Sequence, residues 1–111
     1  MKFNSQICTT REQSERLLSL GLKKETADMY YEGRLEGEWP RIMPHKTEMD
    51  YFNLWDSIIP AWSLHRLIEM VAHTRYPYYV ISKELPIYDA LCERIEWLIK
   101  EGYFNKEYLE E

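Results

Sequence analysis

The sequence has no long apolar run, and this lack excludes a helix that crosses a membrane. Such a helix needs about 20 consecutive apolar residues, and the 111 residues hold no comparable stretch. The opening MKFNSQICTTREQSER also lacks an apolar segment after its lysine, so we expect no secretory signal there. We therefore expect a cytoplasmic protein with no membrane partner.

Cysteine and glycine are scarce, which removes several kinds of cofactor site. The two cysteines, Cys8 and Cys92, form no CxxC pair, so their spacing indicates neither a zinc knuckle nor a thioredoxin-type site. The four glycines form neither a GxGxxG motif nor a P-loop. We predict no cofactor and no metal site, and we expect reduced, partly buried thiols.

Positive charge is also in short supply, since 14 basic residues stand against 19 acidic ones and the formal net charge is -5. This balance repels a polyphosphate unless the basic residues gather on one face, and the sequence shows no such cluster. A nucleic-acid partner is therefore disfavoured. The apolar share is ample, because 45% of the residues are hydrophobic, and we expect residues 1–111 to form a single domain.

Four helices are predicted from caps, stops and apolar periodicity. Thr10 and Gln13 have the spacing of a capping box before the first helix, and Gly21 is suited to end it. The last helix has an apolar stripe at spacings of three and four. The predicted helices are Arg11–Leu20, Lys24–Tyr31, the segment IPAWSLHRLIEMVAH, begun by Pro60 or capped by Ser63, and the stretch from Pro86 to Gly102.

Three short segments are rich in aromatic and β-branched residues and are predicted to be strands. They are Trp39–Met43, Tyr51–Trp55 and Tyr76–Ser82, the last placed at a sheet edge or a strand start by Pro77. The predicted fold class is α+β, a single compact domain of about four helices with a small antiparallel sheet or hairpin. The apolar residues after the last helix are expected to fold back on the core, namely Tyr103, Phe104, Tyr108 and Leu109.

The sharpest candidate for chemistry is a set of three side chains, His65, Glu69 and His73, spaced by four residues on one predicted helix. Their order differs from HExxH, and a helical wheel places them away from the apolar stripe. A solvated face is favoured, with a metal-dependent hydrolase as the alternative. A thiol nucleophile, Cys8 or Cys92, with a histidine base is a second enzyme alternative, although buried structural thiols are favoured.

Two further clusters also have structural explanations. Glu32, Glu36 and Glu38 are suited to bind a hard cation or to act as acid and base, but the run EGRLEGE does not match a calcium loop and is typical of a solvated turn. The segment from Arg75 to Lys83 mixes basic residues with three tyrosines, a composition that can stack single-stranded bases. Its alternation fits an edge strand better, and the net charge opposes nucleic acid.

Three stretches, ICTTREQSERLLSLGLKKETADMYY, IPAWSLHRLIEM and DALCERIEWLIKEGYF, resemble a group of short uncharacterised proteins of Bacteroides-type genomes, often found among prophage or mobile-element genes. The resemblance spans most of the chain. Members of that group have no assigned activity, so the resemblance implies no catalytic residue. It implies a small accessory protein that binds other proteins, including acidic inhibitors that imitate the charge of DNA.

These features together predict a non-enzymatic protein-interaction module, with a protein partner or a second copy as its target and no small-molecule substrate. Aromatic side chains are the usual anchors of such contacts. Two alternatives stay open: an acidic mimic of nucleic acid that occupies a DNA-binding partner, and a metal- or cysteine-dependent hydrolase. The residues expected in the contact surface are Trp39, Trp55, Trp62, Tyr76, Tyr78 and Tyr79.

Overall fold

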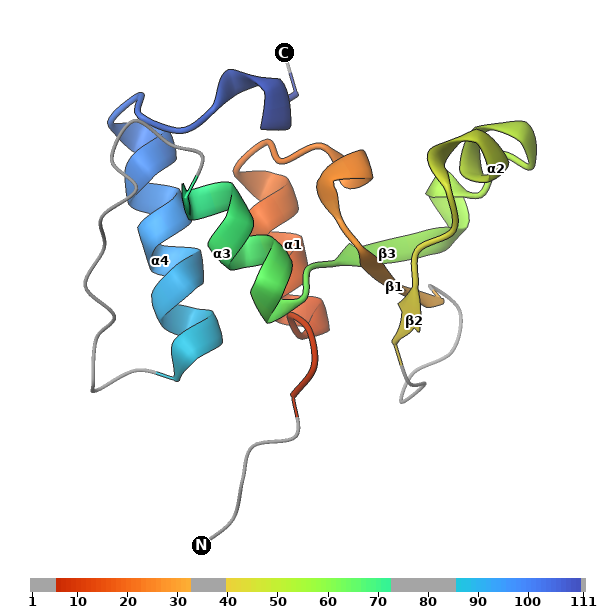
Figure 1. Cartoon of the computed structure of the whole chain (residues 1–111), viewed down its shortest axis with the longest axis horizontal. Coiled ribbons are helices and arrows are strands. Elements are labelled where there is room, and N and C mark those ends of the chain that lie inside the picture. The colour runs from red at the N-terminus through yellow and green to blue at the C-terminus, as the bar shows by residue number, and fades with distance from the viewer. Residues whose placement is uncertain (1–5, 33–39, 73–85, 111) are drawn as a thin grey trace, which may run out of the picture.

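The computed structural model describes residues 6–32, 40–72 and 86–110. Within these ranges the chain forms four α-helices and a three-stranded antiparallel sheet, which confirms the predicted α+β class. In Figure 1, α1, α3 and α4 lie together on one side of the sheet and α2 lies at the opposite end. The helices are α1 (Arg11–Ser19), α2 (Lys46–Tyr51), α3 (Leu64–Ala72) and α4 (Ile87–Lys100), and the strands are β1 (Met29–Glu32), β2 (Arg41–Ile42) and β3 (Ile58–Ala61).

The ends of α1 and α4 follow the sequence signals. The Gln13 N–H donates to the Thr10 hydroxyl at 3.1 Å, and the Thr10 N–H donates to the Gln13 side chain at 2.9 Å, which confirms the capping box. Gly21 and Gly102 follow the two helices with φ angles of 99° and 77°. Glycine suits these left-handed positions because an L side chain is strained there. None of the helices in the described ranges is long and apolar enough to span a membrane.

The sheet has the order β2-β1-β3, with β1 in the centre and antiparallel to both neighbours. Tyr30 of β1 lies opposite Arg41 of β2 on one side and Pro60 of β3 on the other. At the end of β3, the Thr9 N–H donates to the Trp62 carbonyl at 2.9 Å. The sheet is thereby tied to the segment that leads into α1.

The predicted helix over residues 24–31 is wrong. Lys24–Thr26 forms a single 3-10 turn, and the chain is extended from Ala27 into β1. The Asp28 carboxylate accepts hydrogen bonds from the amide and the hydroxyl of Ser63, which fixes this segment beside the start of α3. Pairing of β1 with two strands satisfies its backbone groups, and this long-range effect outweighs the helical spacing of its apolar residues.

The predicted strand at Tyr51–Trp55 is also wrong, because this segment holds the last residue of α2, a turn, and the start of a 3-10 turn. His45 caps α2, and its Nδ1 accepts the Thr47 N–H at 3.2 Å. Asn53 then adopts a φ of 51°, which an extended strand does not allow. Tyr51 and Phe52 of this segment are exposed and take no part in the sheet.

Of the two predicted starts of α3, one is wrong and one is confirmed. Pro60 lies in β3 and does not begin a helix. Ser63 is the cap, since its hydroxyl accepts the Arg66 N–H at 3.1 Å, which confirms the second of the two predicted starts. The strand β2 falls inside the predicted Trp39–Met43 segment, whereas the predicted strand Tyr76–Ser82 lies outside the described residues.

The core lies among α1, α3, α4 and the segment after α4. Its members are buried side chains that include Leu17, Trp62, Leu67 and Ile95. The segment after α4 packs on this core through Phe104, with Tyr103, Tyr108 and Leu109 beside it, so the predicted return of the chain is confirmed. Two backbone hydrogen bonds fasten it: Lys23 N–H to Tyr108 at 2.8 Å, and Glu110 N–H to Gly21 at 2.6 Å.

Candidate functional site

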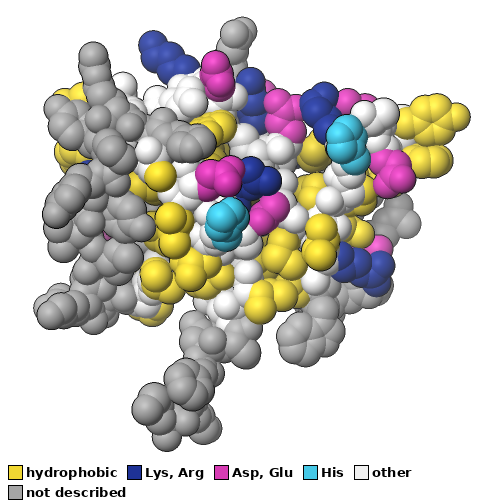
Figure 2. Space-filling view, viewed as in Figure 1, with side chains coloured by type: hydrophobic (Ala, Val, Ile, Leu, Met, Phe, Trp, Pro, Cys, Tyr) yellow, Lys and Arg dark blue, Asp and Glu magenta, His cyan; other side chains and the backbone are white. Residues whose placement is uncertain are grey.

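Two large aromatic side chains stand out from the end of α2. Tyr51 and Phe52 are 81% and 61% exposed, and their rings meet edge to face with centroids 4.9 Å apart. We call this pair the aromatic tip. Figure 2 shows apolar side chains at the α2 end of the molecule, where they reach its outer limit. A contiguous exposed pair of this size is typical of contact surfaces, whereas single exposed apolar residues are common everywhere.

Helix geometry explains why the aromatic tip points outward. Met49 is 1% exposed and anchors the inner side of α2. Tyr51 follows two residues later, which is about 200° around the helix, so the two side chains lie on opposite faces. The carboxyl end of α2 is closed by the Leu54 N–H, which donates to the Met49 carbonyl at 3.0 Å, and by the turn at Asn53.

An apolar hollow of about 340 Å³ lies between α2 and the sheet, and we call it the α2 hollow. Met49 lines it together with Tyr30 of β1 and Ile58 of β3, so the sheet and the helix both contribute to its walls. Glu32 supplies the one ionisable carboxylate of the lining, and its oxygen lies 3.9 Å from the Arg41 guanidinium. The full lining is Tyr30, Glu32, Pro44, Met49, Leu54, Ser57 and Ile58.

A second hollow, of about 290 Å³, borders α2, and because six of its seven lining residues are charged we call it the polar hollow. Its central group is Lys46, whose Nζ lies 2.9 Å from Asp50 and 3.6 Å from Glu25. The hydrogen bond from Lys46 is the main cause that lowers the pKa of Asp50 and raises the pKa of Lys46. The Trp55 indole N–H also donates to Asp50 at 2.7 Å. The lining holds three lysines and three carboxylates, so the hollow offers little net charge to a ligand.

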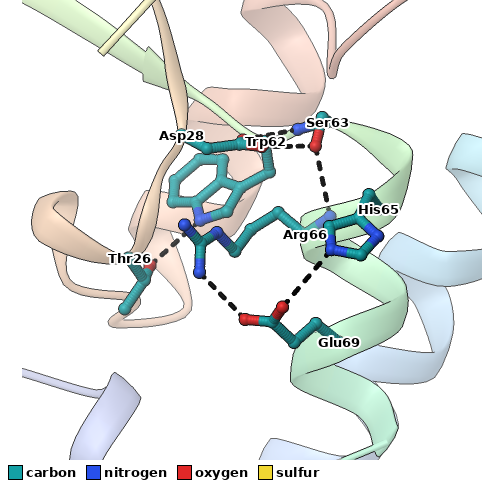
Figure 3. Close-up of polar contacts among 7 residues, drawn as sticks. All are labelled: Thr26, Asp28, Trp62, Ser63, His65, Arg66 and Glu69. Carbon is teal, nitrogen blue, oxygen red and sulfur yellow. Dashed lines mark hydrogen bonds and ion pairs between the residues drawn. The ribbon is translucent and has the colours of Figure 1, made fainter. Parts of the chain in front are cut away.

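A polar network joins α3 to the segment before β1, as Figure 3 shows. The Ser63 hydroxyl donates to the Asp28 carboxylate and accepts the Arg66 N–H. The nearby imidazole, His65, contacts Glu69 instead. A serine nucleophile needs a base that accepts its proton, and here the hydroxyl is held by a structural carboxylate and a helix cap. The network therefore fastens α3 and does not form a nucleophile and base.

Comparison with known proteins places this chain in no family. No protein-family model, no curated protein and no solved structure matches it. The resemblance to short mobile-element proteins stays a prediction.

The structure places two of the residues predicted for a contact surface. Trp62 is fully buried, and its indole N–H donates to the Thr26 hydroxyl at 2.9 Å, so it belongs to the core and offers no surface to a partner. Trp55 is half-buried in the wall of the polar hollow. The other four, Trp39, Tyr76, Tyr78 and Tyr79, lie outside the described residues.

The predicted metal triplet is only partly placed. His65 is 86% exposed at its side chain, and its Nε2 lies 3.4 Å from Glu69, which also binds the Arg66 guanidinium at 3.0 Å. This arrangement is an ion-paired, solvated helix face. His73 lies outside the described residues, and the described parts of the chain bring no three His, Cys, Asp or Glu side chains together as metal ligands.

The two thiols are buried and unbridged, as expected for structural cysteines. Cys8 and Cys92 are 1% and 0% exposed. Burial raises the pKa of Cys92 to about 11 and raises that of Cys8 as well. An activated nucleophile has a lowered pKa. The nearest polar side-chain contact of Cys8 is the Tyr31 hydroxyl at 3.5 Å, not an imidazole.

Several carboxylates of the described surface lie beside basic side chains. Glu96 lies between Arg16 and Lys100, and Glu32 lies near Arg41. Figure 2 shows the same mixing of charges on the face in view. A mimic of nucleic acid needs carboxylates without such bases between them, so this mixing counts against that alternative. The other two members of the predicted acidic cluster, Glu36 and Glu38, lie outside the described residues.

Sequence reasoning missed the aromatic tip. Tyr51 and Phe52 were assigned to a strand, where one of two neighbours would face inward. A usable signal was present: Lys46 and Asp50 have the i,i+4 spacing of a helical ion pair, which the structure shows at 2.9 Å. Continued as a short helix from Lys46, the sequence places Met49 and Tyr51 on opposite faces.

Proposed function

We propose that the chain is a protein-interaction module that binds its target through the aromatic tip. The observation on which this proposal depends is the exposed, edge-to-face pair of Tyr51 and Phe52 at the end of α2. Full burial of an aromatic or aliphatic side chain is worth roughly 1.5–3 kcal/mol. In the free chain most of this free energy is not realised at Tyr51 and Phe52, because both rings are largely exposed. A partner that covers both rings gains it on binding.

The setting of the tip supports the same proposal. It is carried by a short helix that is anchored by Met49 and braced by the Lys46 and Asp50 ion pair. Aromatic anchors bind well when they are held in place, because little side-chain entropy is then lost on contact. We further propose that the module is a cytoplasmic accessory protein of a mobile element, which rests on the resemblance and not on the fold.

Replacement of both rings tests the proposal. The tagged chain and its Y51S/F52S variant are used to capture proteins from the native host, with quantitative mass spectrometry as the measurement. The matched control is Ile7→Ser, because Ile7 is 51% exposed and lies before α1, away from α2. We expect the captured proteins to be lost with Y51S/F52S and kept with Ile7→Ser.

Circular dichroism first establishes that both variants are folded. Equal capture by the wild type and Y51S/F52S would show that the aromatic tip is not the contact surface. Equal loss with both variants would show that the captured proteins recognise exposed apolar residues without selectivity.

A further inference from the structure

We infer that protonation of His45 loosens α2, so that mild acid releases the short helix that carries the aromatic tip. The loosening of α2 rests on the geometry of its cap, and its effect on binding rests on the proposed function. His45 is exposed and stands directly before α2, and the Thr47 N–H donates to its Nδ1 at 3.2 Å. The imidazole is therefore the side-chain cap of this helix.

The cap requires the neutral form of the imidazole. A neutral ring accepts at Nδ1 only when its proton is on Nε2, and protonation places an N–H on Nδ1 as well. The cation of His45 therefore cannot accept the Thr47 N–H, and its charge lies at the amino end of a helix, where cations are unfavourable. Histidine ordinarily titrates near about pH 6.5. The cap is thus present above this pH and is lost as the pH falls through it.

The helix α2 depends on its cap because little else holds it in place. It has only the residues Lys46–Tyr51, and its buried residue is Met49. Among the described residues, Met49 is not a member of the buried core that joins α1, α3 and α4. Figure 1 shows α2 at the end of the molecule away from these helices. An element with so few buried contacts can open locally while the rest of the chain stays folded.

The other charged groups near the start of α2 ordinarily keep their charge between about pH 5.5 and 7.5. Lys46 and Asp50 lie 2.9 Å apart, and the hydrogen bond between them raises the pKa of Lys46 and lowers that of Asp50. The rest are Glu48 in the first turn of α2, and Glu25, Asp28 and Arg66, which line a hollow with Pro44 and Lys46. His45 is therefore the group through which α2 responds to mild acid.

Amide hydrogen exchange of the free protein tests the inference. It is followed by NMR at about pH 7.5 and about pH 5.5, with correction for the intrinsic effect of pH on exchange. The reporter is the Phe52 amide, which donates to the Glu48 carbonyl at 3.0 Å. We expect its protection to fall about fivefold in acid, the usual effect of losing a helix cap. The Tyr103 amide, which donates to the Leu98 carbonyl after α4, should keep its protection.

Three variants identify the group that titrates. Asparagine is among the best cap residues and carries no titrating group, so His45→Asn should show equal protection of α2 at both pH values. His45→Ala has no cap, so at the higher pH it should show the low protection that the wild type shows in acid. His65→Asn is the matched control, because His65 is also exposed but pairs with Glu69 on α3. It should respond to pH like the wild type.

Equal protection of wild-type α2 at both pH values, or the same fall in His45→Asn, would overturn the inference. Capture of host proteins is then measured with the wild type, His45→Asn and Y51S/F52S at both pH values. We expect tip-dependent capture to weaken in acid for the wild type and to persist for His45→Asn. Tip-dependent capture that is equal for both chains in acid would reject the effect on binding. Loosening of α2 without any tip-dependent capture would keep the His45 switch and reject the proposed function.

Discussion

At the scale of single residues, the two thiols give the simplest prediction. Cys92 is fully buried with a pKa of about 11, so its thiolate fraction at pH 8 is about a hundredfold below that of an ordinary cysteine. Cys8 is also buried and its pKa is raised. We expect Cys92 to react with Ellman's reagent at least about a hundredfold more slowly in the native protein than in guanidinium, and Cys8 to react more slowly in the native protein as well. A fast reaction of the native chain with Ellman's reagent would contradict the burial of the two thiols.

The Ser63 hydroxyl carries two structural hydrogen bonds, and its removal has a predictable cost. Ser63→Ala deletes the cap of α3 and one of the two Ser63 donors to Asp28. We expect a loss of about 1–3 kcal/mol in the free energy of unfolding, measured by urea denaturation. Ser19→Ala is the control, because its exposed hydroxyl donates only to the Arg16 carbonyl at 2.6 Å. Similar losses in the free energy of unfolding of both variants would contradict the structural role of Ser63.

At the scale of elements, the features predicted well are those encoded by near neighbours in sequence. The Thr10 and Gln13 box, Gly102 and the apolar stripe of α4 all act within one element, so α1 and α4 were located correctly. The segment at 24–31 failed because β1 depends on partners more than ten residues further along the chain. Its tyrosines suit strand and helix patterns equally until those partners are known.

The candidate site also combines features encoded by near neighbours with features that depend on distant residues. A buried Met49 and exposed rings beside it follow from a short helix, but α2 has only the residues Lys46–Tyr51 and too few turns to show a clear period. The α2 hollow arises from residues of β1, β3 and α2 together. No local pattern encodes such a recess, since it exists only after the sheet and the helix have packed.

The stop of α4 gives a prediction about an element boundary. Gly102 has a φ of 77°, and a Cβ added there meets nothing within 4 Å, so the cost of substitution is conformational and not steric. We expect Gly102→Ala to lower the free energy of unfolding by about 1–2 kcal/mol. Gly102→Asn should cost less, because asparagine tolerates the left-handed region. Thermal unfolding followed by circular dichroism measures both, and an alanine variant as stable as the wild type would contradict this backbone geometry.

At the scale of the whole molecule, α1 and α4 are held together by polar contacts outside the core. The Arg16 guanidinium donates to Glu96 at 2.6 Å, and the Gln13 amide donates to Asp89 at 2.6 Å. Residues some 80 positions apart in the chain are joined in this way. The helical side of the molecule is therefore sensitive to charge as well as to packing.

The contact between Arg16 and Glu96 makes the stability of the protein depend on pH. Hydrogen bonds from Lys100 and Arg16 hold the pKa of Glu96 below its ordinary value. A lowered folded pKa contributes stability that is present above about pH 4.3, the ordinary value for glutamate, and that is lost as the pH falls through the folded pKa. Glu96→Gln should lower the urea midpoint near neutral pH, and the difference from the wild type should shrink towards about pH 3 and in high salt. Glu15→Gln, at an exposed position of α1, is the matched control and should show neither change. A Glu96→Gln deficit that persisted undiminished in acid would mean that its cause is lost packing and not the carboxylate charge.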